Sequence, residues 1–292
     1  MDILSVQSHV SWGYVGNAVA VPTAQALGVN IWPINTVRLA HHPGHATALG
    51  KPWGSVTDTN EIVGLMQGAL AQISGPIALQ IGYLGHAEQG MKALDVHEAA
   101  TSAARPIPFY LDPAFGDEAE GIYVSDNIVD FYKTVALPRA DVLMPNRFEL
   151  THLSGQSIET ADDAVDAART VIAQGPKMVL VSSVPVAGEQ IGNLLITRDH
   201  AWMAAVPRLK LKAKGTGDML SAAFVALNLS GQLNSANPAD ALQRAVSLVH
   251  LAASDAAKRG LVEMDVPDAL KIIGSAMHLI HSEPLDTGRL GV

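Results

Sequence analysis

Residues 160–182 read TADDAVDAARTVIAQGPKMVLVS, and this stretch indicates the fold class. Thr160, followed three residues later by Asp163, predicts the N-terminal cap of a helix, and Gly175-Pro176 predicts its end. Residues 178–182 form a short apolar run, which is typical of a strand covered on both faces. A helix that leads into such a strand favours an α/β fold with right-handed crossovers and parallel strands.

The same alternation extends along the chain. Strands are expected at residues 3–6, 30–36, 77–81, 108–111 and 141–144, and helices at 16–27, 58–73 and 87–104. A β-hairpin is expected at 191–206, and Asn237-Pro238 predicts the start of a long helix that ends at Gly260. We expect one domain over residues 1–292, with three α/β/α layers and a mostly parallel central sheet. Residues 38–57, rich in His, Gly and Pro, are the expected excursion from it.

Composition excludes several classes of protein. Hydrophobic residues make up 48% of the 292, so the chain can bury a large core. There is no cysteine, which excludes disulfides, thiolate metal ligands and a cysteine nucleophile, and fits a reducing cytoplasm. The net charge of −9 argues against a nucleic-acid partner. The N-terminus lacks the features of a signal peptide, and no apolar run is long enough to span a membrane.

The sharpest chemical motif is Gly215-Thr216-Gly217-Asp218, which is followed by residues in helical spacing. The two glycines let the backbone approach a ligand closely, and the helix that follows directs its N-terminal amides at the ligand. These features predict an anion hole. A carboxylate beside an anion hole suits alcohol phosphorylation, because one group orients the hydroxyl and the other stabilises developing charge. The alternative is that Asp218 only caps a helix after a glycine turn.

Four cations precede this motif, at Arg208, Lys210, Lys212 and Lys214. Strand-like alternation would place them on one face, where they could form a collar for nucleotide phosphates. The alternative is a solvated strand face. The chain contains neither a Walker phosphate loop nor a dinucleotide-binding fingerprint.

Several motifs, in order along residues 3–225, resemble those of pyridoxal kinases in the ribokinase superfamily. They are SHV (8–10), GYVGN (13–17), NTV (35–37), GYLG (82–85), DP (112–113), PNRFE (145–149) and GTGD (215–218). The resemblance implies a ribokinase-like fold and ATP-dependent phosphorylation of the 5′-hydroxymethyl group of pyridoxal, with pyridoxine and pyridoxamine as further acceptors. It also implies a homodimer with Mg²⁺ as cofactor, and it leaves a monovalent cation open. A cytoplasmic location is expected from the N-terminus, the lack of a membrane span and the lack of cysteine.

The resemblance also implies residue roles. In catalysis, Asp218 would orient the hydroxymethyl group, and Gly215, Thr216 and Gly217 would supply the anion hole. The substrate would contact Asp218 and a set of residues nearer the N-terminus, namely Ser8, Val37, His42, Pro43 and Tyr83. ATP would contact the anion hole together with Asp112, Asn146, Glu149 and Ser182, and with Arg208 and Lys210 of the expected collar. Asp112 and Glu149 would hold Mg²⁺ through water, and residues 117–121 would cover the nucleotide.

Structural alternatives stay open for some of these residues. Asn146 and Glu149 could simply begin a helix, Asp112 could be a turn residue, and Tyr83 could be a core aromatic.

The chain departs from the family in its histidine-rich segment. His41-His42-Pro43-Gly44-His45 stands where relatives commonly read Asn-His-Thr, then Gly or Gln, then Tyr. Pro43 therefore offers neither a hydroxyl nor an amide proton to the substrate. Leu111, Met144 and Val181 also depart from the family, and together these changes put substrate affinity and monovalent-cation binding in question. The three histidines suggest a metal site, but a flexible substrate-covering loop is favoured over it.

Two other functions compete with pyridoxal phosphorylation. One is a hydroxymethylpyrimidine kinase of the same superfamily, against which the motifs at 8–17 and 82–85 argue. The other is a protein that binds or delivers B6 vitamers with little turnover. The intact Asp218, Asn146 and Glu149 argue against that function, whereas Pro43 keeps it open.

Overall fold

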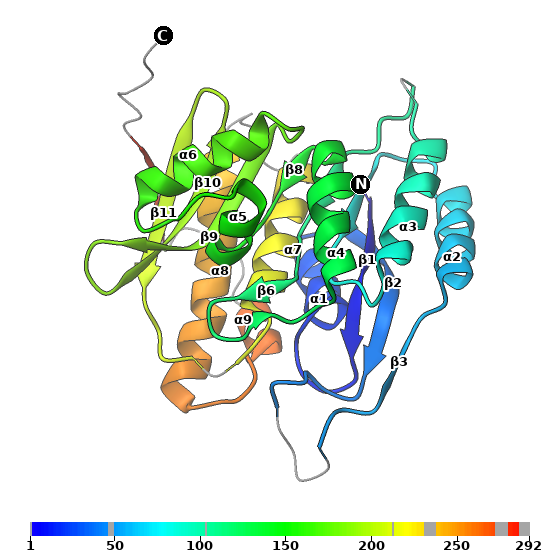
Figure 1. Ribbon diagram of the computed structural model, residues 1–292. Coiled ribbons are helices and arrows are strands. Elements are labelled where there is room, and N and C mark those ends of the chain that lie inside the picture. Colours follow the sequence, from blue (N-terminus) through cyan, green and yellow to red (C-terminus); the bar gives the residue numbers. More distant parts are fainter. Residues whose placement is uncertain are drawn as a thin grey trace.

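The computed structural model describes residues 2–45, 50–102, 104–211, 213–230, 238–271 and 280–285. In these parts of the chain, ten strands form one central sheet (Figure 1). From edge to edge they are β12 (Glu283–Pro284), β11 (Ala201–Pro207), β10 (Gln190–Thr197), β9 (Met178–Val186), β8 (Val142–Leu143), β5 (Phe109–Leu111), β4 (Ile77–Ile81), β1 (Asp2–Val10), β2 (Asn30–Leu39) and β3 (Gly54–Val56).

The middle of this sheet is parallel and its edges are antiparallel. The neighbours from β9 through β8, β5, β4 and β1 to β2 all pair in parallel. At one edge β9, β10, β11 and β12 pair antiparallel, and at the other edge β3 pairs antiparallel with β2. The expected parallel sheet and the expected hairpin are both confirmed. A separate small hairpin joins β6 (Gly116–Asp117) to β7 (Gly121–Ile122).

Helices cover both faces of the sheet and complete the three layers. One core contains residues of α2 (Thr59–Gln72), α3 (Ala87–Ala100), α4 (Asp126–Phe131), α5 (Arg147–Ser154) and α6 (Ala161–Ile172). The other core contains residues of α1 (Asn17–Ala26), α7 (Thr216–Leu229), α8 (Pro238–Arg259) and α9 (Val266–Lys271). A π-helical turn (Tyr132–Ala136) and a 3₁₀ turn (Leu137–Arg139) follow α4.

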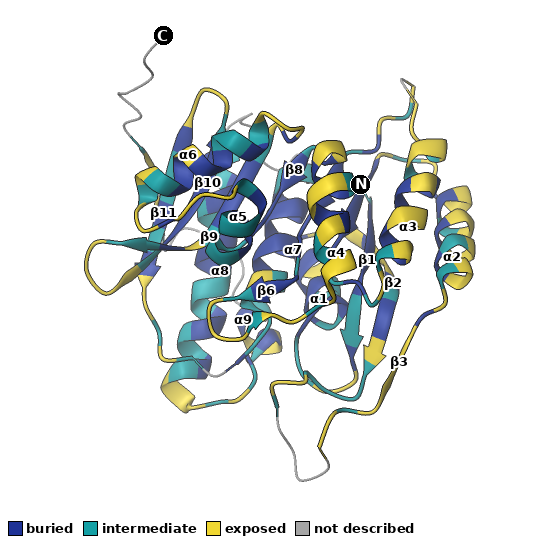
Figure 2. Ribbon diagram, in the orientation of Figure 1, coloured by how far each residue is buried: buried dark blue, intermediate teal, exposed yellow. Residues whose placement is uncertain are grey.

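The sheet separates the two cores because successive side chains of a strand point to opposite faces. In β1, Leu4 and Val6 pack into the first core, and Ile3 packs into the second. Figure 2 shows the same arrangement, with buried residues on the strands and on the helix faces that are turned toward them.

The local signals for helix ends act as the sequence predicts. Thr160 and Asp163 form a reciprocal capping box at the start of α6, in which each side chain accepts a backbone hydrogen bond. The long helix α8 ends at Arg259, and Gly260 follows with a φ of 64°, a left-handed value that glycine adopts without strain. Asn237, the expected cap of α8, lies outside the described residues.

Two predictions on element boundaries differ from the structure. The expected excursion at 38–57 is shorter, because β2 continues to Leu39 and β3 returns to pair with it. The expected strand character of this segment is wrong for its described residues, 208–211 and 213–214. β11 ends at Pro207, opposite the first residue of β10, so in the described structure no partner strand continues beyond it.

None of the helices in the described parts of the chain has the length and apolar character that a membrane span requires.

Candidate active site

A cavity of about 750 Å³ lies at the carboxyl ends of the parallel strands, where the loops after β1, β5 and β8 meet the N-terminus of α7. It brings together residues that are far apart in the sequence. The predicted site residues that line it are Ser8, Val37, His42, Pro43, Tyr83, Asp112, Asn146, Glu149, Ser182, Arg208, Gly215, Thr216, Gly217 and Asp218. Lys210, also predicted, is described by the structure but does not line the cavity.

The N-terminus of α7 supplies the anion hole. Gly215 is its N-cap, with a φ of 87°, and Asp218 lies in the first helical turn. A Cβ at position 215 would collide with the Tyr14 carbonyl oxygen, so both the backbone angle and the space require glycine. The first N–H groups of a helix have no intrahelical partner and carry its positive dipole end. This turn can therefore bind an anion.

The motif at 13–17 packs directly against this anion hole. The Gly16 N–H donates to the Asp218 carboxylate and orients it. Gly16 has a φ of 55°, and a Cβ there would meet Ser8. These contacts bring Asp218 next to Ser8 and Gly16, although Asp218 follows them in the chain by some 200 residues.

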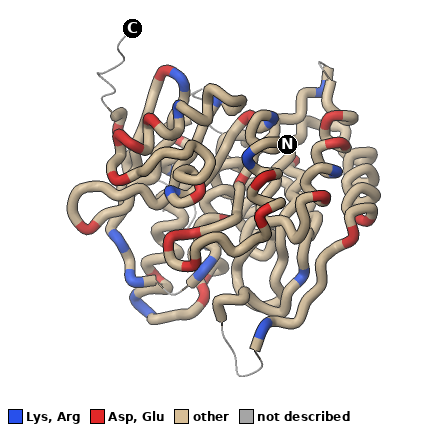
Figure 3. The backbone as a smooth tube through the Cα atoms, viewed as in Figure 1, with Lys and Arg blue, Asp and Glu red and all other residues tan. Residues whose placement is uncertain are grey.

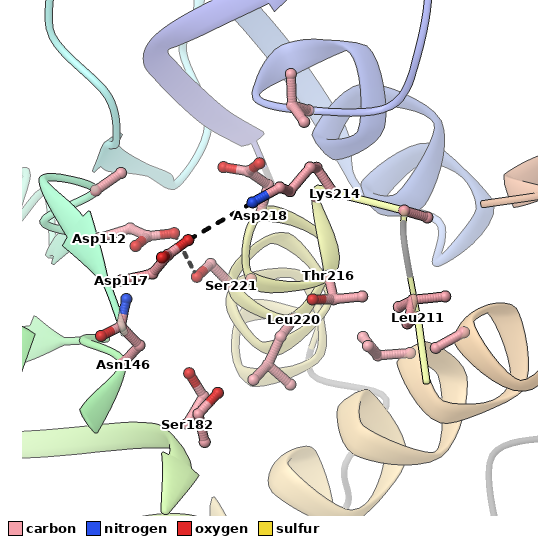
Figure 4. Close-up of a pocket in the computed structure, with 18 of the residues that line it drawn as sticks. Asp112, Asp117, Asn146, Ser182, Leu211, Lys214, Thr216, Asp218, Leu220 and Ser221 are labelled. Atoms are coloured by element: carbon pink, nitrogen blue, oxygen red, sulfur yellow. Dashed lines mark hydrogen bonds and ion pairs between the residues drawn. The ribbon is translucent and has the colours of Figure 1, made fainter. Parts of the chain in front are cut away.

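Two carboxylates line the cavity, and among the described residues neither has a cationic partner. Asp112 is 7% exposed, and Asp218 contributes a second negative charge beside it. Burial and the charge of Asp218 raise the pKa of Asp112 to about 7, against the lowering effect of the Ser221 hydroxyl, which donates to Asp112 Oδ2 at 2.6 Å. Burial raises the pKa of Asp218 to about 6. Figure 4 shows Asp112, Ser221 and Asp218 together at the α7 end of the cavity.

Asn146 and Glu149 form the capping box that starts α5. Asn146 Oδ1 accepts from the Glu149 N–H at 3.0 Å, and Glu149 Oε2 accepts from the Asn146 N–H at 2.9 Å. Glu149 Oε1 also accepts from Phe115 N–H and Gly116 N–H, and the side chain is 2% exposed. Burial and the charge of Asp112 raise the pKa of Glu149 well above its usual range. The pair therefore begins a helix and also lines the cavity.

The carboxylates fit a hydrated divalent cation better than a closed metal cage. Among the described residues, no group of three or more His, Asp or Glu side chains is placed to hold a metal, so the histidine-rich segment forms no such site within its described part. The uncompensated charges of Asp112 and Asp218 nevertheless favour a cation. Mg²⁺ keeps several waters and binds through one or two carboxylates and substrate phosphates, which matches this donor set.

Another set of lining residues suits a flat ring. Val37, Tyr83 and Ser8 line it, and Tyr83 and Tyr123 have ring centroids 6.4 Å apart. Thr36 Oγ1 donates to the Tyr83 carbonyl at 2.6 Å and fixes the backbone there. His42 and Pro43, in the segment after β2, also line the cavity, and burial lowers the pKa of His42.

The predicted collar of cations does not form as a strand face. Arg208 and Lys214 line the cavity, and Lys212 lies outside the described residues. Lys214 bonds to carboxylates of the β6–β7 hairpin instead of lying free. Ser182, expected at a strand end, lies within β9. The neighbouring strand β8 has already ended at this level, and the Ser182 N–H donates to the Pro145 carbonyl.

Several residues of the cavity were not identified from sequence. Ser221 bonds to Asp112, and Tyr123 faces Tyr83. At the far end, Asn193 of β10 and His250 of α8 line a region bounded by apolar side chains. Ser221 lies one helical turn after Asp218, so helical periodicity could have identified it. For Asn193 and His250 the sequence carries no local signal.

A carboxylate and an anion hole on one helix turn, at the carboxyl edge of a parallel sheet in an α/β/α fold, define a phosphotransferase acting on a small molecule.

Comparison with known proteins identifies the family within this class. A sequence model of the family described as phosphomethylpyrimidine kinase matches residues 60–266. Pyridoxal kinase PdxY of Rubrobacter xylanophilus is 34% identical over 271 residues, covering 91% of each chain. Its namesake in Paraburkholderia xenovorans is 36% identical, covering 79% of this chain and 81% of its own.

A solved structure agrees with these sequences. Pyridoxal kinase from Leishmania donovani, in complex with ADP and pyridoxamine, superposes with a TM-score of 0.83 at 25% identity, covering 97% of this chain and 99% of its own. The chain belongs to the pyridoxal kinase family.

Proposed function

We propose that this protein transfers the terminal phosphoryl group of ATP to the 5′-hydroxymethyl group of pyridoxal, giving pyridoxal 5′-phosphate and ADP. The observation that supports the proposal is that one cavity is lined by Ser8, Val37 and Tyr83 and also by Asp218, which stands in the helical turn that forms the anion hole of α7. The Leishmania donovani relative binds ADP and pyridoxamine, which supports a nucleotide and a B6 vitamer as the two ligands.

The chemistry follows from this geometry. The pyridoxal hydroxyl oxygen forms a bond to the γ-phosphorus while the bond from that phosphorus to the ADP oxygen breaks, and the hydroxyl proton passes to the Asp218 carboxylate. A pKa of about 6 makes Asp218 a better acceptor than an exposed aspartate, and it is still ionised at neutral pH. In a loose transition state the proton can leave late, so orientation matters more than basicity.

The other residues bind and neutralise. The N–H groups of Thr216 and Gly217, in the first turn of α7, would face the phosphoryl oxygens, where negative charge develops. Asp112, with Glu149 behind it, would hold Mg²⁺ through water. A Mg²⁺ ion held there would supply positive charge against the phosphates. Asn146, Ser182 and Arg208 would contact the nucleotide, whose base would occupy the apolar end near Asn193 and His250.

We also propose that residues 1–292 act as one domain, that the segment within 38–57 covers the substrate, and that a monovalent cation can assist. A homodimer is proposed from the family resemblance. A cytoplasmic location is proposed from the absence of cysteine, which fits a reducing compartment.

A hydroxymethylpyrimidine kinase is the second candidate, favoured by the match to the phosphomethylpyrimidine kinase family over residues 60–266. The test is phosphorylation of pyridoxal, pyridoxine, pyridoxamine and hydroxymethylpyrimidine side by side, with ATP and Mg²⁺. Preferential turnover of pyridoxal is expected. Turnover of the pyrimidine alone would change the substrate and keep the mechanism. Pyridoxal binding without turnover of any compound would favour a binding or delivery protein.

A further inference from the structure

The hairpin formed by β6 and β7 places three carboxylates on the wall of the active-site cavity, from Asp117, Glu118 and Glu120. Each carboxylate faces a cation that lines the same cavity. Lys214 Nζ lies 2.5 Å from Glu120 Oε1 and 3.8 Å from Asp117 Oδ2, and an Arg147 Nη2 lies 2.8 Å from Glu118 Oε1. Figure 3 shows the acidic hairpin in red, and Figure 4 shows Lys214 reaching across to Asp117.

Lys214 differs from the other cations in its position along the chain and in its contacts. It immediately precedes Gly215, the N-cap of the helix that supplies the anion hole, and its side chain is 32% exposed. Of the lysines that the structure describes, it alone lines the cavity. Arg147, in contrast, is also tied to the Ile158 carbonyl at 3.0 Å, which holds it against the protein backbone. In its described contacts, the Lys214 ammonium bonds only to hairpin carboxylates.

We propose that Lys214 is a binding residue for the nucleotide phosphates, and that Glu120 and Asp117 compete with the phosphates for its ammonium group. The inference rests on the proposed kinase function, because it assumes that phosphates bind at the α7 anion hole. Phosphate bound there lies next to residue 214 along the chain. The hairpin carboxylates then act as an internal substitute for the phosphate.

The energetics permit such an exchange. An ion pair whose partners are about one-third exposed contributes at most about 1 kcal/mol, so it breaks readily. A nucleotide polyphosphate carries several negative charges, and the anion hole binds it at the same time, so it competes well for one ammonium group. Lysine suits an exchangeable contact, because its ammonium is a compact charge on a flexible stem.

The consequence for the hairpin is mechanical. When a phosphate binds the Lys214 ammonium, the hairpin loses the Lys214–Glu120 contact, which joins it to the loop before α7. The Glu118–Arg147 ion pair of the hairpin persists. Nucleotide binding would then release one side of the hairpin.

The test is the dissociation constant of ATP and of ADP, measured by titration calorimetry in excess Mg²⁺ and without an acceptor. Lys214→Met is expected to weaken both by about tenfold or more, since a charge-assisted contact is lost. Glu120→Gln is expected to tighten both by about two- to fivefold, the range that an exposed ion pair allows. A purely structural ion pair would instead make both variants bind more weakly, and that result would overturn the inference.

Matched controls remove the same charges elsewhere. Lys177→Met breaks the exposed pair with Asp141, and Glu98→Gln breaks the pair with Arg139, and neither residue lines the cavity. Both controls are expected to leave the dissociation constants within about twofold, and thermal unfolding checks that every variant folds. A shift in Lys177→Met as large as that in Lys214→Met would show a general charge effect and overturn the inference.

The double variant Lys214→Met/Glu120→Gln tests whether Glu120 competes with the phosphates for Lys214 or only repels the nucleotide. Under competition, Glu120→Gln tightens binding more when Lys214 is present than in the Lys214→Met background. An equal gain in both backgrounds would show that Glu120 only repels the nucleotide, and would overturn the competition.

Failure of the proposed function gives a different pattern. Wild-type protein that binds no nucleotide would overturn both the function and the inference. The expected shifts without turnover of pyridoxal would support the inference and overturn the function.

Discussion

Asp112→Asn is expected to stabilise the protein at alkaline pH while it abolishes turnover. Asp112 is buried beside Asp218 and has no cationic partner in the described structure, so its ionised form is destabilised in the folded protein. Its pKa rises from 3.8 to about 7 on folding. A neutral amide of nearly the same shape removes that cost and can still accept the Ser221 hydrogen bond.

The magnitude follows from linkage. A carboxyl whose pKa is raised by folding costs no stability below its unfolded pKa, an increasing amount between the two values, and the full amount above its folded pKa. A shift of about 3 units corresponds to about 4 kcal/mol at pH 8, and to only about 1.5 kcal/mol at pH 5. Coupling to Asp218 divides this cost between two groups, so we expect Asp112→Asn to gain about 2–4 kcal/mol at pH 8.

The assay is urea unfolding of wild type and Asp112→Asn at pH 5 and pH 8, in the presence of EDTA. The gain in the free energy of unfolding should be larger at pH 8 by about 1–3 kcal/mol. Asp95→Asn, at a carboxylate whose side chain is 63% exposed, serves as the control and should show no such trend. A gain that is equal at both pH values, or a loss at pH 8, would refute the reasoning that burial destabilises the Asp112 charge.

Other predictions concern the α7 turn. Asp218→Asn should lower turnover by about 10³-fold or more and leave pyridoxal binding, measured by calorimetry, within a few fold; nearly unchanged turnover would contradict the role of Asp218. Because Asp218 must be ionised to accept the proton, kcat/KM of wild type should fall about tenfold per pH unit below its pKa of about 6, and a flat acid limb would contradict this role. Gly215→Ala should cost about 2–4 kcal/mol in thermal or urea unfolding because of its left-handed φ and the Tyr14 carbonyl, whereas Gly217→Ala, with open space around its Cβ, should cost about 1 kcal/mol or less. Equal losses in the two glycine variants would show that the Tyr14 contact is not limiting.

The parts of the fold that depend on local chemistry were predictable. The capping box of Thr160 and Asp163, the glycine after α8 and the apolar run at 178–182 each act within a few residues. Alternation of strands and helices then restricted the topology to parallel strands with crossovers. Most predicted site residues also line one cavity, because their motifs follow the carboxyl ends of parallel strands.

The described residues from Arg208 to Leu211, together with Ala213 and Lys214, show where local patterns fail. Alternating cations look like a strand face, but a strand needs a partner for its backbone groups, and β10 offers none beyond Pro207. The pattern also gave no indication that Lys214 bonds to Glu120, which is 94 residues away in the sequence.

The sequence by itself determined the strand and helix order, the glycine turn before Asp218 and the absence of any thiol chemistry, because these depend on residue type and short-range spacing. Only the tertiary structure decided which groups share the cavity. It places Asp112 beside Asp218, raises the pKa of both by burial, and brings the hairpin carboxylates to Lys214. These properties depend on distance and solvent exclusion between segments that are remote in the chain, and the free energy of a charge is set by that environment.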